Sequence, residues 1–117
     1  MGTFTHPITL IGPGGERRTV EALVDSGSTF TSMPRGILAD LGVEPRREVS
    51  LRLADGTSHL QQLGRVLIQL DGLEEITFVV FGEAESPPTI GAVILETLLL
   101  GVDPAGQRLV PVEGWRA

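Results

Sequence analysis

The sequence predicts a single, mostly β domain with two short helices, and three observations lead to this class. The chain has 117 residues, which is enough for one hydrophobic core but not for two. It contains 15 glycines and 8 prolines but few aromatic side chains, a composition that favours short strands and tight turns over a helix bundle. Several short segments also alternate apolar with polar residues and end at turn dipeptides such as Asp55-Gly56. We therefore expect residues 1–117 to form one domain.

The first half of the chain is expected to form a hairpin, a short strand and a helix. Gly12-Pro13-Gly14-Gly15 is a turn signal between two apolar segments. Pro34 suits the first turn of a helix, and Gly42 ends that helix. The expected elements are strands at residues 4–11, 17–24 and 30–33 and a helix at residues 34–41.

The second half is expected to add two further hairpins, a second helix and a final strand. Asp55-Gly56 and Asp71-Gly72 are hairpin-turn signals. Residues 82–88 form a polar, proline-rich loop, and Gly101 with Pro104 would close the second helix. The expected elements are strands at residues 48–53, 59–70, 75–81 and 107–112 and a helix at residues 92–100.

The composition argues against several classes of function. A net charge of −6 makes nucleic acid an unsuitable partner. The chain has no cysteine, which excludes disulfides, thiol catalysis and cysteine-based zinc sites. His6 and His59 are isolated and lack the spacing of metal ligands, so we expect no metal and no other cofactor.

The N-terminus and the longest apolar segment both favour a cytoplasmic protein. Residues 1–11 contain no basic cluster and no long apolar run, so no signal peptide is expected. The longest apolar segment, residues 89–102, carries Glu96 and is too short to cross a bilayer. We therefore expect no membrane partner.

The candidate site is Asp25-Ser26-Gly27-Ser28-Thr29, which directly follows the apolar strand end Ala22-Leu23-Val24. A carboxylate there would lie at the end of a buried strand, on a tight glycine turn and among hydroxyl groups. Such surroundings can hold Asp25 ionised and directed at a second group. The alternative is an ordinary turn aspartate that accepts hydrogen bonds from nearby backbone N–H groups.

Three features together resemble the retropepsin-like aspartic proteases, most closely their single-domain bacterial members. These features are Asp25-Ser26-Gly27-Ser28, the central hairpin at Asp55-Gly56, and Ile90-Gly91 before a C-terminal helix. The resemblance covers roughly residues 20–112. It implies the acid-protease fold, a closed β-barrel or sandwich, and the hydrolysis of peptide bonds.

The resemblance also implies roles for individual residues. Asp25 corresponds to the catalytic aspartate, and the Ser26 hydroxyl to one that bonds the other subunit's backbone. Gly27 permits the turn and the close approach of the substrate backbone. Ser28 corresponds to the position that bonds the catalytic carboxylate in the pepsin branch and is usually alanine in viral members. The implied substrate-binding residues are Leu23, Thr29, Leu53, the flap tip Ala54-Asp55-Gly56-Thr57, and Thr89-Ile90-Gly91, which backs the catalytic loop.

The chemistry of this family implies a homodimer. Peptide hydrolysis by carboxyl groups needs one ionised group to activate water and one protonated group to donate to the carbonyl. The chain has a single Asp-Ser-Gly motif and is too short to contain a second lobe. Two copies of Asp25 must therefore meet at a two-fold axis and share one proton. We expect an acidic pH optimum and a peptide or protein substrate.

Two other functions fit the sequence. The first is a retropepsin-like domain that serves for dimerisation or peptide binding without catalysis, and the second is a small-molecule binder that uses the same cleft. The lack of a recognisable flap tip favours the non-catalytic module, whereas the intact loop at Asp25 favours the enzyme. Residues 4–10 and 107–112 are apolar enough to pair across a dimer axis.

Overall fold

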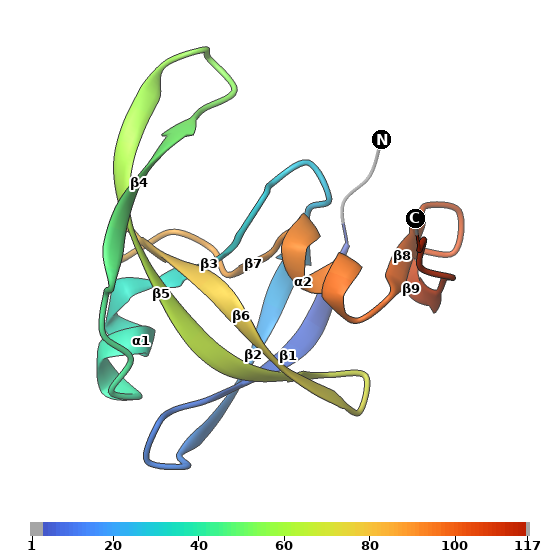
Figure 1. Ribbon diagram of the computed structural model, residues 1–117, viewed down its shortest axis with the longest axis horizontal. Helices are drawn as coiled ribbons and strands as arrows, with labels where there is room; N and C mark the ends of the chain where they lie inside the picture. The colour runs from blue at the N-terminus through green and yellow to red at the C-terminus, as the bar shows by residue number, and fades with distance from the viewer. Residues whose placement is uncertain (1–3, 117) are drawn as a thin grey trace.

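The computed structural model describes residues 4–116 and confirms a mostly β fold with two short helices (Figure 1). Every expected hairpin is present, and most element ends lie within two residues of the expected positions. In chain order the elements are β1 (Thr5–Ile11), β2 (Arg17–Val24), β3 (Thr31–Pro34), α1 (Arg35–Asp40), β4 (Arg47–Arg52), β5 (Ser58–Leu70), β6 (Leu73–Gly82), β7 (Thr89–Ile90), α2 (Ala92–Thr97), β8 (Leu100–Asp103) and β9 (Arg108–Pro111).

Seven of the strands form one sheet that closes on itself. The strand order is β1-β2-β7-β3-β6-β5-β4, and β1 also pairs with β5. Because β1 pairs with β5, all the strands of this order except the last close into a barrel, and β4 remains outside it. The hairpin of β4 and β5 therefore projects from the barrel, as Figure 1 shows at the upper left. β8 and β9 form a separate two-stranded sheet next to α2.

The interior of the barrel is filled by apolar side chains that alternate along the strands. In β5, Val66, Ile68 and Leu70 are buried, whereas Leu67 and Gln69, which alternate with them, are only half-buried. Alternation of this kind is what a strand with one face on the core requires. Two polar residues, Thr31 and Thr77, are buried as well.

The expected helix over residues 92–100 is wrong beyond Thr97. α2 ends at Thr97, Leu98 caps it, and Leu99 adopts a left-handed conformation with φ of 56°. Leu100 then starts β8, which pairs with β9 and places the Leu100 side chain in the core. Pairing with β9, which follows after a short turn at residues 104–107, thus outweighed the helical propensity of a leucine run. No helix within residues 4–116 is long and apolar enough to span a membrane.

Candidate active site

The loop after β2 holds the Asp25 carboxylate by both of its oxygens. The backbone N–H of Gly27 donates to Oδ1 over 3.0 Å, and the hydroxyl of Ser28 donates to Oδ2 over 3.0 Å. The N–H of Ser28 also donates to the Asp25 carbonyl, which closes the turn. Asp25 and Ser28 are half-buried, while Ser26, Gly27 and Thr29 are exposed. The carboxylate is therefore oriented by its own loop and remains reachable from outside.

A second segment, distant in sequence, fixes this loop from behind. β7 is only two residues long and lies between β2 and β3, parallel to the former and antiparallel to the latter. The carbonyl of Ile90 accepts a hydrogen bond from the N–H of Asp25 over 3.0 Å. The first N–H groups of α2, at Ala92 and Val93, donate to the carbonyls of Ser28 and Thr29. The loop thus satisfies backbone donors that a helix start leaves unpaired.

Gly91 is required by the close approach of these two segments. A Cβ at this position would lie 2.4 Å from both the carbonyl carbon and the oxygen of Phe30 and 2.9 Å from the Ser28 oxygen. The Gly91 N–H donates to the hydroxyl of Thr31, a fully buried side chain, over 3.2 Å. Any larger residue would force the loop away from β7.

The strand register places six residues in a continuous row across the sheet, beginning two residues before Asp25. Each member is paired directly with the next, so all six side chains lie on one face. Val80 and Leu63 in this row are buried yet lie outside the main core cluster, as expected for the face opposite the barrel interior. We call this set the cross-strand row; it consists of Leu23 (β2), Thr89 (β7), Ser32 (β3), Val80 (β6), Leu63 (β5) and Arg47 (β4).

Comparison with known proteins agrees with this architecture. The family model described as aspartyl protease matches residues 8–103, which is most of the chain. The chain belongs to the aspartyl protease family.

Among solved structures, the protease is similar to the solution structure of the simian foamy virus (mac) protease. The two are 16% identical, and the match covers 78% of this chain and 90% of the viral chain with a TM-score of 0.57. At this identity the likeness concerns the fold, and the retropepsin-like fold is thereby confirmed. No curated protein sequence matches the chain.

The hairpin tip of the protease has the turn that the sequence predicts, but it stands away from Asp25. At the tip the Leu53 N–H donates to the Thr57 carbonyl and the Gly56 N–H donates to the Leu53 carbonyl, and Gly56 adopts a φ of +87°. Asp55 Oδ1 accepts hydrogen bonds from both the hydroxyl and the N–H of Thr57. In Figure 1 this tip is separated from the loop between β2 and β3. The hydrogen bonds described for Leu53 to Thr57 all stay within the β4–β5 hairpin.

Apart from the exposed Thr29, the predicted substrate-binding residues fall into three groups. Leu23 and Thr89 lie on the cross-strand row, and both are half-buried. Ile90 and Gly91 are buried, so the Ile90 side chain packs in the core and only its backbone serves the loop. The residues of the hairpin tip, Leu53, Ala54, Asp55, Gly56 and Thr57, are exposed.

Sequence reasoning missed several residues of this face of the protease. Phe30, directly after the predicted motif, packs edge-to-face on Phe78 with ring centroids 6.0 Å apart. Val49 and Leu51 are half-buried on the hairpin face that carries Arg47, while their neighbours in β4 are exposed. The alternation within β4 was visible in the sequence. Which other strands share the face of Val49 and Leu51 depends on the pairing of β4 with β5 and of β5 with β6.

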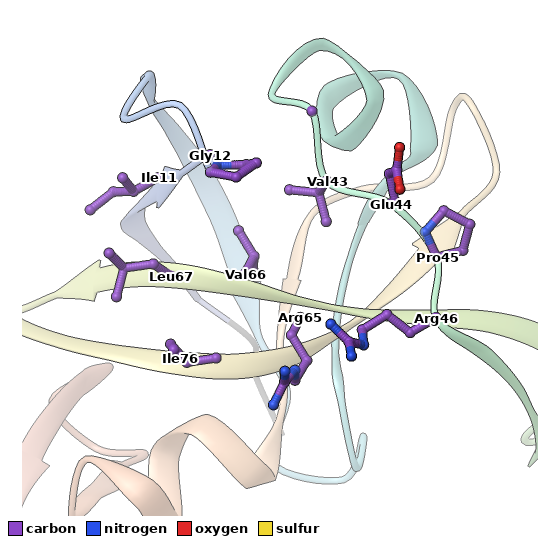
Figure 2. A pocket seen from close by; sticks show the side chains of 12 residues that line it. Ile11, Gly12, Val43, Glu44, Pro45, Arg46, Arg65, Val66, Leu67 and Ile76 are labelled. Atoms are coloured by element: carbon purple, nitrogen blue, oxygen red, sulfur yellow. The ribbon is translucent and has the colours of Figure 1, made fainter.

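Two hollows lie at the base of the projecting hairpin rather than at Asp25. The larger, of about 900 Å³, is bounded by the β1–β2 turn, the segment after α1, and strands β5 and β6 (Figure 2). The smaller is about 300 Å³ and has Phe78 in its wall. Within residues 4–116 no group of three or more His, Cys, Asp or Glu side chains is placed to bind a metal ion.

Proposed function

We propose that this aspartyl protease is an endopeptidase whose active site forms when two copies of the chain bring their Asp25 side chains together. The observation that carries the proposal is the geometry of Asp25. Both carboxylate oxygens are held by the loop itself, and the group remains partly exposed. A turn aspartate that serves only its own loop does not need a buried glycine, a two-residue strand and a helix start behind it.

One Asp25 carboxylate cannot perform both halves of the reaction. The ionised carboxylate of one copy takes a proton from water as the water oxygen attacks the peptide carbonyl carbon. The protonated carboxyl of the other copy gives its proton to the carbonyl oxygen. The carboxyl that took the water proton then gives it to the peptide nitrogen, the other carboxylate takes a proton from a hydroxyl of the tetrahedral intermediate, and the C–N bond breaks to give an acid and an amine. Two like charges about 3 Å apart repel by roughly 5 kcal/mol at an effective dielectric near 20, so one shared proton is the stable state of the pair.

The face that carries the cross-strand row is suited to an extended peptide. The row begins beside Asp25 and ends in β4, and Val49 and Leu51 continue the same face along the hairpin. A peptide that lay between this floor and the hairpin could place alternate side chains on it. The hairpin, folded toward Asp25, would then serve as the flap.

The C-terminal segment supports the proposed dimer. Within the described chain β9 pairs only with β8, so one edge of β9 is free for pairing across a two-fold axis. Leu99, Val112 and Trp115 expose apolar surface there, and Trp115 is fully exposed. β1 is a weaker candidate than β9, because its residues Thr9 to Ile11 already pair on both sides.

One observation favours a different function, a peptide-binding or dimerisation module without catalysis. The hairpin tip stands apart from the catalytic loop (Figure 1), and no described contact holds it over Asp25. A module that only binds peptide would not need a closing flap.

The test is cleavage of a mixed peptide library between about pH 3 and pH 7, with the wild-type protein beside Asp25→Asn. The proposal expects cuts by the wild type that the variant does not make, although both are folded and dimeric. Gly36→Ala, at a site in α1 with free space around it, serves as the matched control for substitution itself. No wild-type cleavage at any pH by folded, dimeric protein would contradict the proposal and leave the binding module.

A further inference from the structure

Three arginines of this acidic chain gather at one place without a carboxylate partner. All nine basic residues are arginines, and the net charge is −6. Four of the nine form ion pairs with Asp or Glu. Arg46, Arg47 and Arg65 form none among residues 4–116, although carboxylates outnumber arginines in the chain. Their charges are therefore available to a ligand.

The three arginines line the smaller hollow, which we call the arginine cleft. It has a volume of about 300 Å³, and its walls are Arg46, Arg47, Leu63, Gly64, Arg65 and Phe78. The chain fixes these positions through the backbone: the Arg46 N–H donates to the Leu63 carbonyl over 2.8 Å, and Arg47 and Arg65 are paired in register with Leu63 and Phe78.

Two of the three arginine side chains extend to one side of the sheet. Figure 2 shows that Arg46 and Arg65 extend to the same side of β5, whereas the carboxylate of nearby Glu44 points away from both. Like charges held together repel one another, and an anion placed between them relieves that repulsion. Guanidinium groups bind carboxylates with two parallel hydrogen bonds, so a carboxylate is the anion of matching shape.

The arginine cleft is continuous with the catalytic loop. Phe78 forms its wall and packs against Phe30, which follows Asp25 by five residues in the same loop. Arg47 and Leu63 are also the far end of the cross-strand row that begins at Leu23. A peptide extended along this row from Asp25 would therefore place a side chain at the arginine cleft, several residues from the bond to be cut.

We propose that the arginine cleft binds an acidic side chain of the substrate and makes the protease selective for peptides with Asp or Glu at one position distant from the scissile bond. This inference rests on the proposed endopeptidase function. The overall negative charge of the chain disfavours acidic peptides in general. A preference for Asp or Glu at one position must therefore come from local positive charge, which the arginine cleft supplies.

The experiment compares pairs of peptides that differ only by Glu or Gln at one position, scanned along a sequence that the wild type cuts. We expect kcat/KM to be about fivefold to tenfold higher for Glu at one position, and this ratio to fall at high salt. Arg47→Gln with Arg65→Gln should bring the ratio of the two kcat/KM values close to one, because both peptides then meet the same uncharged cleft. Arg18→Gln, which removes an exposed arginine paired with Asp40, is the matched control and should keep the ratio.

Two results would overturn the inference: a ratio near one at every position, or a ratio that survives in the double arginine variant. If the wild type cuts neither peptide, the proposed endopeptidase function has failed. The preference of the arginine cleft for an acidic side chain is then tested by peptide binding instead of cleavage. Fluorescence anisotropy of labelled Glu and Gln peptides with the Asp25→Asn protein should show the same preference and its loss in the double variant. Equal binding of the two peptides would contradict the inference in that case as well.

Discussion

The hydroxyl of Ser28 donates a hydrogen bond to Oδ2 of Asp25 over 3.0 Å, while the other carboxylate oxygen accepts from the Gly27 N–H. The resemblance to the pepsin branch implied this bond, and the structure contains it. Because Ser28 also presents its carbonyl to the first N–H of α2, one residue links the carboxylate to the helix behind the loop. The orientation of Asp25 is thus coupled to the position of α2.

Ser28→Ala should lower kcat about threefold to tenfold, the effect of removing one hydrogen bond worth roughly 1 kcal/mol. KM should change little, because Ser28 orients the carboxylate and is not needed to hold the peptide. Ser28→Thr keeps the hydroxyl and is the matched control. Steady-state kinetics on one peptide measures both parameters, and a rise in KM at constant kcat would show that Ser28 acts in binding instead.

Gly91→Ala should destabilise the fold by about 1–3 kcal/mol or more. The new methyl group would lie 2.4 Å from backbone atoms of Phe30, which cannot rotate aside as a side chain could. Gly36→Ala is the opposite case, since nothing lies within 4 Å of its Cβ position in α1, and it should stabilise by about 0.5–1 kcal/mol. Urea unfolding measures both, and unchanged stability of Gly91→Ala would mean that the loop and β7 are less tightly packed than described.

The same substitution should have opposite effects at the two buried threonines. The Thr31 hydroxyl accepts the Gly91 N–H, whereas the Thr77 hydroxyl has no partner among the described residues. Thr31→Val should therefore cost about 1–3 kcal/mol, because it leaves a buried N–H unpaired. Thr77→Val should stabilise by about 1 kcal/mol, because it removes a polar group that burial penalises. Thermal unfolding decides the signs, and a lower Tm for Thr77→Val would reveal a partner for that hydroxyl.

The hairpin tip should be sensitive to acid through Asp55. Hydrogen bonds from the Thr57 hydroxyl and then from the Thr57 N–H lower the pKa of Asp55 below its ordinary value. A lowered pKa in the folded state means that these bonds stabilise the turn above the ordinary aspartate pKa and that this contribution is lost as pH falls through the lowered value.

Thr57→Val should raise the pKa of Asp55 toward its ordinary value, whereas Thr57→Ser should leave it low. NMR titration of the Asp55 carboxyl carbon measures the difference. An identical titration in wild type and Thr57→Val would mean that the hydroxyl contributes nothing in solution.

The sequence was sufficient to predict the hairpins and the turn that holds Asp25 after β2, because both depend on local chemistry. Asp55-Gly56 and Asp71-Gly72 mark turns by their backbone preferences, and Asp25-Ser26-Gly27 follows an apolar strand directly. β8 was missed although it forms a local hairpin with β9, because the leucine run at residues 98–100 favours a helix and hides the start of the strand.

The far end of the candidate site was beyond local reasoning for a similar reason. The local sequence assigns no role to Arg47 or Arg65, and only the register that links β4, β5 and β6 places them beside Phe78. For Ile90 the family resemblance implied a place in substrate binding, whereas the structure buries its side chain in the core.

Subunit mixing tests most directly whether two copies of Asp25 act as one catalytic pair. Wild-type protein is equilibrated with a roughly ninefold excess of Asp25→Asn at concentrations where both are dimeric, and peptide cleavage per wild-type subunit is measured. If the pair is required, random exchange leaves about a tenth of wild-type subunits in fully wild-type dimers, and activity should fall to about that fraction. Undiminished activity per wild-type subunit, with exchange verified, would show that each Asp25 works alone and would contradict the account.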